Sequence, residues 1–364
     1  MTLPGTYTIN GKTFDKKHLQ EHAQRMAEET GVPAWEKELF GFINDFLSED
    51  QPLYQRTSGT TGDPRVFPLL RSAMLRSAQN TLQYFNLRPG NHALLCLPVE
   101  YIAGKMMVVR ALAGQLNLVT TRPAGNPLAD QPSDVDFAAM VPLQLEQSIG
   151  QLEDNSKIRT LILGGGETGP ALRTKIRETK GCAIYETFGM SETYTHFAVR
   201  RLNGPDPEPF FRLLPGVKVW TDERGCLVTE VPGVTEAPVV TNDMVSLEGD
   251  NRFRWLGRID NVIKTGGIKI NPEVLEAQIR EITGLEVLVS PLPDERLGER
   301  LVLVVEGREK DLPAGLGQQL SNTLQKHEIP RIILTLKEFP RNRSMKTDRL
   351  QVLRFVRKHF QGLG

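Results

Sequence analysis

The sequence has few cysteines, no long apolar run and no excess of charge of either sign. Cys96, Cys182 and Cys226 are odd in number and far apart, and they form no CxxC or Cys/His spacing. A disulfide framework or a zinc site is therefore not expected, and a reducing compartment fits better. The 44 basic residues balance the 44 acidic ones, so no overall field points to nucleic acid or to an anionic membrane.

The chain also lacks segments that would direct it into a membrane. No apolar run reaches about 18 residues. The start, MTLPGTYTINGKTF, has no basic segment followed by an apolar core. We therefore expect a soluble, cytoplasmic protein without a nucleic-acid partner or membrane insertion. At 364 residues, the chain is long enough for two domains.

Apolar strand patterns alternate with helical patterns in the first half of the chain. A hairpin is predicted around Asn10-Gly11, followed by helices at roughly 15–29 and 34–47. Strands are predicted within 92–99 and 116–121 and at the starts of 158–169 and 182–193, with helices at 103–114 and 170–180. This spacing favours an α/β fold with a mostly parallel sheet, whose functional loops collect at the carboxyl ends of the strands. The loops 164–169 and 188–193 are predicted to lie at that edge.

The pattern of predicted strands and helices changes twice further along the chain. From about Pro215, short strands and turns indicate a small β-rich subdomain. From about Asp260, strands and helices form an α+β pattern of about 100 residues, a size consistent with an independent domain. The sequence thus predicts a large N-terminal domain, 1–259, and a small C-terminal domain, 260–364.

One short segment, TSGTTGDPR at 57–65, is crowded with Gly and Thr. Gly costs backbone entropy in regular structure, and Thr side chains compete for backbone hydrogen bonds. The segment does offer exposed N–H and hydroxyl donors that can surround an anion. By itself it is more typical of a plain surface loop, so its context must decide.

Five segments, taken in order, resemble motifs of the adenylate-forming superfamily, which includes acyl- and aryl-CoA ligases, luciferases and peptide-synthetase adenylation domains. They are TSGTTGDPR (57–65, the phosphate loop), ETFGMSET (186–193, adenine and metal), TNDMV (241–245, ribose), GRIDNVIKTGGIKINPEVLE (257–276, the hinge) and PRNRSMKTDRL (340–350, the lysine loop). The resemblance implies an AMP-binding domain followed by a mobile C-terminal lid. Only 56 residues precede the phosphate loop, so an abbreviated N-terminal part is expected.

The resemblance implies a set of nucleotide-binding residues. The ATP phosphates would be held by Thr57, Ser58, Gly59, Thr60, Thr61, Gly62 and Arg65, the adenine side by Gly165, Gly166, Glu167, Phe188, Gly189 and Met190, the α-phosphate by Ser191, and the ribose by Asp243 and Arg258. Arg65 stands where the family usually has lysine, and Phe188 where it has tyrosine. Phe188 could instead be a core residue, and Asp243 with Arg258 a surface ion pair.

The resemblance also implies catalytic roles. Glu192 would hold Mg²⁺, a cation that prefers carboxylate and phosphate oxygens. Lys346 would offset the repulsion between the attacking carboxylate and the α-phosphate, although Met345 replaces the glycine that commonly precedes it. Asp260 would be the hinge. After rotation, the segment containing Lys264, Gly266 and Gly267 would approach coenzyme A.

Two further segments, 97–107 and 189–203, are similar to those of the compact o-succinylbenzoate–CoA ligases of menaquinone biosynthesis. This similarity implies a small-molecule carboxylic acid, ATP and CoA as partners. The acid pocket would include Tyr101, Ile102, Gly104, Thr195 and His196, with His196 either a carboxylate contact or a structural residue. Another aryl or short acyl acid, or a non-catalytic nucleotide-binding homologue, are the alternatives. The oligomeric state stays open, with a homodimer as one option.

Overall fold

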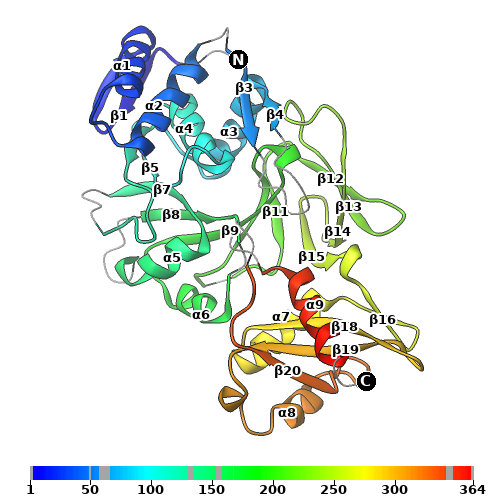
Figure 1. Ribbon diagram of the computed structural model, residues 1–364. Helices are drawn as coiled ribbons and strands as arrows, with labels where there is room; N and C mark the ends of the chain where they lie inside the picture. Colours follow the sequence, from blue (N-terminus) through cyan, green and yellow to red (C-terminus); the bar gives the residue numbers. More distant parts are fainter. Residues whose placement is uncertain are drawn as a thin grey trace.

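The computed structural model describes residues 3–48, 51–56, 66–129, 134–152, 158–166, 168–205, 207–341 and 347–361. Two large sheets organise these residues, one above the other in Figure 1. A separate two-stranded hairpin, β3 (Leu53–Arg56) and β4 (Val66–Leu69), flanks the segment 57–65.

The larger sheet has thirteen strands in the order β12-β13-β14-β15-β11-β10-β9-β8-β7-β5-β6-β1-β2. Their bounds are β1 (Thr6–Ile9), β2 (Lys12–Asp15), β5 (His92–Leu95), β6 (Asn117–Thr120), β7 (Val135–Met140), β8 (Ile158–Leu163), β9 (Ala183–Gly189), β10 (His196–Arg201), β11 (Phe211–Leu213), β12 (Lys218–Thr221), β13 (Cys226–Glu230), β14 (Val239–Leu247) and β15 (Arg252–Arg258). Pairing is parallel from β1 through β6, β5, β7 and β8 to β9. From β9 to β12 it is antiparallel.

The predicted parallel sheet is therefore confirmed for the middle of the molecule. The β-rich segment after Pro215 does not form a sheet of its own, because β10 and β11 join it to β9 and extend the same sheet. The strands 135–140 and 196–201 lie outside the segments predicted as strands.

Helices cover both faces of the parallel part, as buried parallel sheets require. They are α1 (Lys16–Glu28), α2 (Ala34–Leu47), α3 (Arg71–Tyr84) and α4 (Ile102–Gly114) on one face, and α5 (Pro142–Ser148) and α6 (Pro170–Glu178) on the other. Successive strand residues point to opposite faces. Ala93 and Leu95 accordingly pack with α1–α4, and Leu94 and Cys96 with α5 and α6.

The smaller sheet has five strands: β16 (Ile263–Thr265), β17 (Ile268–Ile270), β18 (Val287–Asp294), β19 (Gly298–Glu306) and β20 (Ile332–Leu336). Helices α7 (Pro272–Thr283) and α8 (Leu316–Thr323) pack on one face, and α9 (Arg349–Gln361) on the other. Short 3-10 helices complete the described elements: η1 (Ile149–Leu152), η2 (Ser191–Thr193), η3 (Ile259–Asn261) and η4 (Glu309–Asp311). β15 leads through η3 into this part, which lies below the larger sheet in Figure 1.

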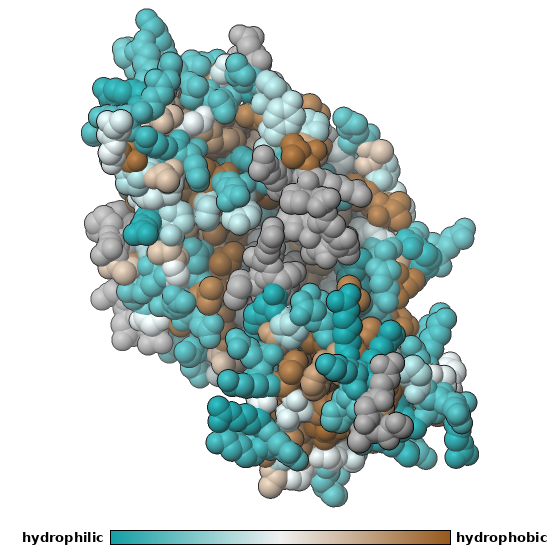
Figure 2. Space-filling view, viewed as in Figure 1, coloured by the Kyte–Doolittle hydropathy of each residue, from teal (hydrophilic) through white to brown (hydrophobic). Residues whose placement is uncertain are grey.

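Hydrophilic residues cover most of the face shown in Figure 2, and hydrophobic ones appear there in small separate groups. Within the described ranges, no helix is both long and apolar enough to pass through a bilayer. Most large apolar side chains instead belong to the cores between the sheets and their helices.

Candidate functional site

Two predicted loops leave the carboxyl ends of neighbouring strands. β8 and β9 are parallel partners, and the Thr187 hydroxyl donates to the Leu163 carbonyl at 2.7 Å. Gly165, with φ +81°, and Gly166 follow β8, while Met190 and Ser191 follow β9. The structure therefore brings these four predicted nucleotide-binding residues to one edge of the sheet, where α/β proteins bind ligands.

The loop after β9 folds back tightly on the strand that it leaves. The Thr193 hydroxyl donates to the Thr195 carbonyl at 2.7 Å and accepts from the Met190 N–H at 3.1 Å. A Cβ on Gly189 would lie 2.3 Å from the Thr195 carbonyl oxygen, so only glycine fits there. The Tyr194 hydroxyl accepts from the Leu70 N–H at 3.0 Å, which anchors the loop just beyond β4. This loop is thus fixed beside the hairpin that flanks residues 57–65.

Glu192 lies in η2 with its side chain exposed. Among the described residues no group of three or more His, Cys, Asp or Glu side chains could hold a metal ion. Mg²⁺ does not need such a cage, because it commonly binds one or two carboxylates together with substrate phosphates. A single accessible carboxylate fits that mode of binding, and the Mg²⁺ role of Glu192 stays a prediction.

The Phe188 ring packs against three other phenylalanine rings. Its ring makes edge contacts with Phe197, Phe211 and Phe253 at centroid distances of 5.7, 5.2 and 5.2 Å. The side chain is still only half-buried. Phe188 is thus part of an aromatic cluster and is also partly accessible. Its stacking on adenine stays a prediction.

Asp243 and Arg258 face each other across β14 and β15. The Asp243 carboxylate accepts from the Trp255 indole at 3.0 Å and lies 3.9 Å from the Arg258 guanidinium. Arg258 also donates to Asp260 at 2.8 Å. That bond is the main reason why the pKa of Asp260 is lowered. The predicted ribose residues and the predicted hinge residue therefore form one charged cluster.

Asn242 completes this cluster. Its amide nitrogen donates to both carboxylate oxygens of Asp260 at 3.1 Å, and its amide oxygen accepts from Arg224, also at 3.1 Å. The Arg224 contact fixes which side of the amide faces Asp260.

The predicted CoA-binding residues form the turn between β16 and β17. Gly266 and Gly267 have φ values of +56° and +82°, a conformation that glycine adopts without strain. The Lys264 N–H donates to Glu299 at 2.8 Å. These three residues belong to the β16–β17 turn of the smaller sheet, whereas the predicted acid-pocket residues belong to the start of α4 and to the start of β10 with the residue before it.

The start of α4 holds three predicted substrate residues. Tyr101, at the N-cap, is 52% exposed, and Ile102 and Gly104 follow it. A Cβ on Gly104 would lie 2.2 Å from the Pro98 carbonyl oxygen. Gly104 therefore permits close contact between α4 and the loop after β5, and has no side chain with which to bind substrate.

Arg110, two turns further along α4, is a functional candidate that the sequence motifs did not indicate. Its side chain is only 1% exposed, and it forms no ion pair with a carboxylate among the described residues. One guanidinium nitrogen lies 3.4 Å from the Thr195 hydroxyl and another 3.6 Å from the Met107 sulfur, while Nε has no partner. Burial lowers the pKa of Arg110 to about 9. A lone arginine in the apolar run MMVVRALAG was the signal that could have identified it.

Arg110 and the predicted residues Thr195 and His196 form one buried polar cluster. The Thr195 hydroxyl is 2.9 Å from the Ser77 hydroxyl, and His196 Nε2 is 3.4 Å from the Thr81 hydroxyl. Tyr101 and Ile102 lie at the other end of the helix segment. The structure therefore separates the five predicted acid-pocket residues into one group at the start of α4, of which only Tyr101 is exposed, and a second group beside Arg110.

Three predicted parts of the site lie outside the described residues. They are the phosphate loop, Thr57 to Arg65; Glu167; and Lys346 with Met345 before it. Their roles stay predictions.

The family of AMP-binding enzymes matches residues 11–259. The chain belongs to this family. It is 26% identical over 347 residues to a probable 2-succinylbenzoate–CoA ligase of Mycobacterium tuberculosis, covering 89% of this chain and 90% of that protein.

Two solved structures are also similar to this AMP-binding enzyme. An acyl-CoA synthetase (AMP-forming)/AMP-acid ligase II-like protein from Dyadobacter fermentans has a TM-score of 0.62 at 32% identity, covering 95% of this chain and 98% of the other. The o-succinylbenzoate CoA synthetase from Bacillus subtilis, in complex with its acyl-adenylate intermediate, has a TM-score of 0.67 at 21% identity. The match covers 82% of this chain and 68% of that one. The expected adenylate-forming fold is confirmed.

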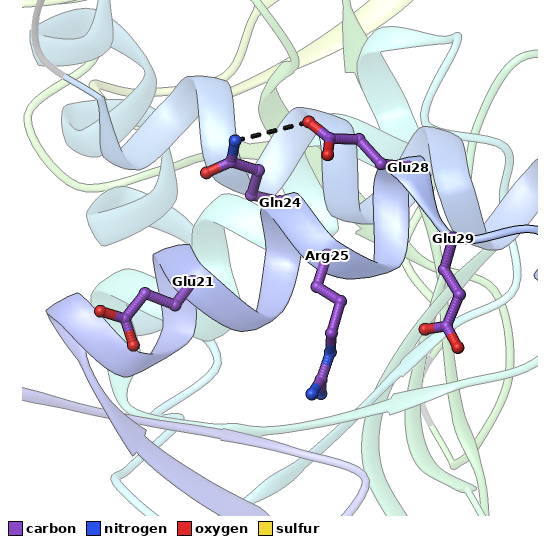
Figure 3. A pocket seen from close by; sticks show the side chains of 5 residues that line it. All are labelled: Glu21, Gln24, Arg25, Glu28 and Glu29. Carbon is purple, nitrogen blue, oxygen red and sulfur yellow. Dashed lines mark hydrogen bonds between the residues drawn. The ribbon is translucent and has the colours of Figure 1, made fainter.

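One hollow on the described surface lies apart from this site. It is lined by five residues of α1 and its C-terminal end, namely Glu21, Gln24, Arg25, Glu28 and Glu29 (Figure 3). Gln24 donates to Glu28 at 3.4 Å within it. None of the predicted site residues lines it, so we assign it no part in the function of the AMP-binding enzyme.

The buried His196 predicts a loss of stability in acid. Burial, and secondarily the charge of Arg110, hold its pKa well below 6.5. Below pH 6.5 the unfolded chain therefore binds a proton that the folded protein does not, and stability falls as the pH falls. We expect His196→Gln to remove about 1 kcal/mol of the loss in unfolding free energy between pH 6.5 and 5.5. Urea unfolding of both proteins at these pH values measures it, and parallel pH profiles would contradict it.

Gly104 predicts a large effect from adding one methyl group. Gly104→Ala should destabilise the AMP-binding enzyme by about 2–4 kcal/mol, because the new Cβ meets backbone atoms of the loop after β5. Gly41→Ala on α2, with open space around its Cβ, is the matched control. It should be neutral or up to about 1 kcal/mol more stable. Equal unfolding free energies for the two variants would refute the close contact.

Proposed function

We propose that this AMP-binding enzyme is an ATP-dependent carboxylic acid–CoA ligase that works through an acyl-adenylate, and that its acid is o-succinylbenzoate, as in menaquinone biosynthesis. The family match and the name of the Mycobacterium tuberculosis relative support this proposal. Its reaction would join the acid to CoA while ATP is cleaved to AMP and pyrophosphate.

The observation that carries the choice of acid is Arg110. A buried cation without a carboxylate partner is costly, so its presence points to an anionic ligand. o-Succinylbenzoate has two carboxylates, of which only one becomes the adenylate. The other keeps its charge throughout the reaction. Arg110 and the hydroxyls of Ser77 and Thr195 offer hydrogen-bond donors for it beside the loop that follows β9.

The nucleotide would lie along the edge formed by the loops after β8 and β9. Residues 57–65 would hold the phosphates, and Phe188 the adenine. Asp243 and Arg258 would bind the ribose. Glu192 would hold Mg²⁺, which when bound neutralises part of the phosphate charge.

The reaction would proceed in two steps on one site. First, a carboxylate oxygen of the acid attacks the α-phosphorus of ATP, forming the acyl-adenylate and releasing pyrophosphate. Lys346 would offset the repulsion between these two anions as they approach each other. Second, the CoA thiol loses its proton and attacks the acyl carbon, and AMP leaves. Positioning by the site supplies much of the acceleration.

We also propose that residues 1–259 and 260–364 form two domains with the hinge at Asp260, and that each step of the reaction uses a different part of the smaller domain. The first step needs Lys346 and the second needs the Lys264–Gly267 turn, so rotation of the smaller part would exchange them. A cytoplasmic location and a homodimer stay predictions.

The test is pyrophosphate release from Mg·ATP with a panel of aryl and short acyl acids, with and without CoA. Release that depends on o-succinylbenzoate, with its thioester appearing only when CoA is present, is the expected result. Release with a different acid would replace the substrate and keep the chemistry. An absence of release with every acid, despite ATP binding, would contradict the proposed function.

A further inference from the structure

A buried ion pair joins the start of α9 to the middle of α7. Glu276, on α7, is 1% exposed. One of its carboxylate oxygens accepts from the Val289 N–H of β18 at 2.7 Å. The other accepts from Arg349, the first residue of α9, and lies 3.9 Å from Arg280. The carboxylate is therefore fixed by a strand, by its own helix and by α9.

Energetics make a purely stabilising role a poor explanation of this pair. Burial raises the pKa of Glu276 to about 7, even though Arg349 and Arg280 both favour its charged form. Buried ion pairs of this kind can often be replaced by apolar residues without loss of stability, and some are retained for the geometry that they impose. The geometry in question is that of the chain entering α9.

The chain that enters α9 is held by contacts between residues on either side of 342–346. The Asp348 N–H donates to the Pro340 carbonyl at 2.7 Å, and Arg341 and Thr347 form an isolated β-bridge. Asp348 also caps α9, because its carboxylate accepts from the Gln351 N–H at 3.1 Å. Lys346 immediately precedes Thr347 in the sequence. The ion pair of Arg349 therefore acts on the anchor from which Lys346 extends.

A second carboxylate links the same arginine to the chain around Asp260. Glu273 lies 3.9 Å from Arg349 and accepts from the Asn261 amide at 2.5 Å. A Cβ on Gly257 of β15 would lie 2.5 Å from a Glu273 oxygen, so α7 is packed directly against the strand that precedes the predicted hinge. Arg349 thus joins the anchor of the lysine segment to α7, and through α7 to β15 and η3.

We infer that Glu276 is a positioning residue for adenylation: through Arg349 it holds the base of the segment carrying Lys346 in the orientation that the first half-reaction needs. This inference rests on the proposed function. Glu276 itself touches no substrate. Its loss should therefore affect the half-reaction that uses Lys346 and leave the thiol half-reaction unaffected.

The test is Glu276→Gln in the full-length protein, with the two half-reactions measured separately. Pyrophosphate release with ATP and acid should fall at least about tenfold in kcat. The KM values, and the rate of thioester formation from supplied acyl-adenylate and CoA, should stay within about twofold. Asp136→Asn, which removes the ion pair of Arg159 on the larger sheet, is the matched control and should leave both half-reactions unchanged.

Arg349→Lys gives an independent reading if Glu276→Gln unfolds. It keeps the charge but not the guanidinium fork, so its adenylation rate should be reduced while thioester formation stays normal. Equal losses in both half-reactions, or no loss in a folded variant, would overturn the inference while leaving the proposed function intact. A wild-type protein without acid-dependent pyrophosphate release would instead overturn the proposed function.

Discussion

Lys346→Ala is expected to lower the rate of pyrophosphate release by at least about a hundredfold, the size of effect seen when one transition-state donor is removed. In the first step a carboxylate approaches a phosphate that already carries charge. An ammonium group placed between them offsets a repulsion that grows as the bond forms. In the second step a thiol attacks a carbonyl carbon, and the same ammonium has no comparable charge to offset.

The same variant should therefore convert supplied acyl-adenylate and CoA to the thioester at a rate within about threefold of wild type. Lys337→Ala is the control, because Lys337 is an exposed lysine between β20 and α9 and should leave both steps unchanged. Rapid-quench measurement of each half-reaction gives the comparison. If Lys346→Ala slowed both steps to the same degree, its assigned role would be wrong.

Arg110→Met should raise the stability of the protein and, at the same time, lower its activity with o-succinylbenzoate. Methionine fills similar space beside Met107 and removes a buried charge, so the free energy of unfolding should rise by about 1–3 kcal/mol. The charge-assisted hydrogen bonds to the second carboxylate are lost, and kcat/KM should fall at least about thirtyfold. Opposite signs of the two effects exclude unfolding as the cause of the lost activity.

An acid with one carboxylate separates substrate recognition from packing. 4-Oxo-4-phenylbutanoate lacks the ring carboxylate, so wild type and Arg110→Met should use it with kcat/KM values within about threefold of each other. Steady-state pyrophosphate release with the two acids measures the difference. If the variant lost the same factor with both acids, Arg110 would serve the architecture of α4 and not the second carboxylate.

The features that the sequence predicted well are those set by local chemistry. Asn10 and Gly11 both have positive φ, as the predicted hairpin turn between β1 and β2 requires. Asp15 caps α1 by accepting from the His18 N–H at 2.9 Å, and the helix predicted from residue 15 begins one residue later. The parallel strands β5, β6, β8 and β9 were also predicted, because each is a short apolar run that ends at a polar loop.

The features that were missed depend on partners far apart in the chain. β10 and β11 are short, and their place in the large sheet comes from pairing with β9 and β15. The buried cluster joins Arg110 on α4 to Ser77 and Thr81 on α3 and to Thr195 after β9. No spacing along the chain connects these residues, since α3, α4 and the loop meet only after the sheet has formed. Resemblance to motifs therefore predicted a nucleotide-binding edge, but it did not predict the buried charge of Arg110.

The most direct single measurement is the mass of the product that forms when the protein is mixed with Mg·ATP and o-succinylbenzoate in the absence of CoA. Ligation through an adenylate predicts a species with the mass of the acid plus AMP less one water, together with pyrophosphate, and its disappearance when CoA is added. Formation of ADP and phosphate would contradict the mechanism, because it would mean attack at the γ-phosphate of ATP and not at the α-phosphate.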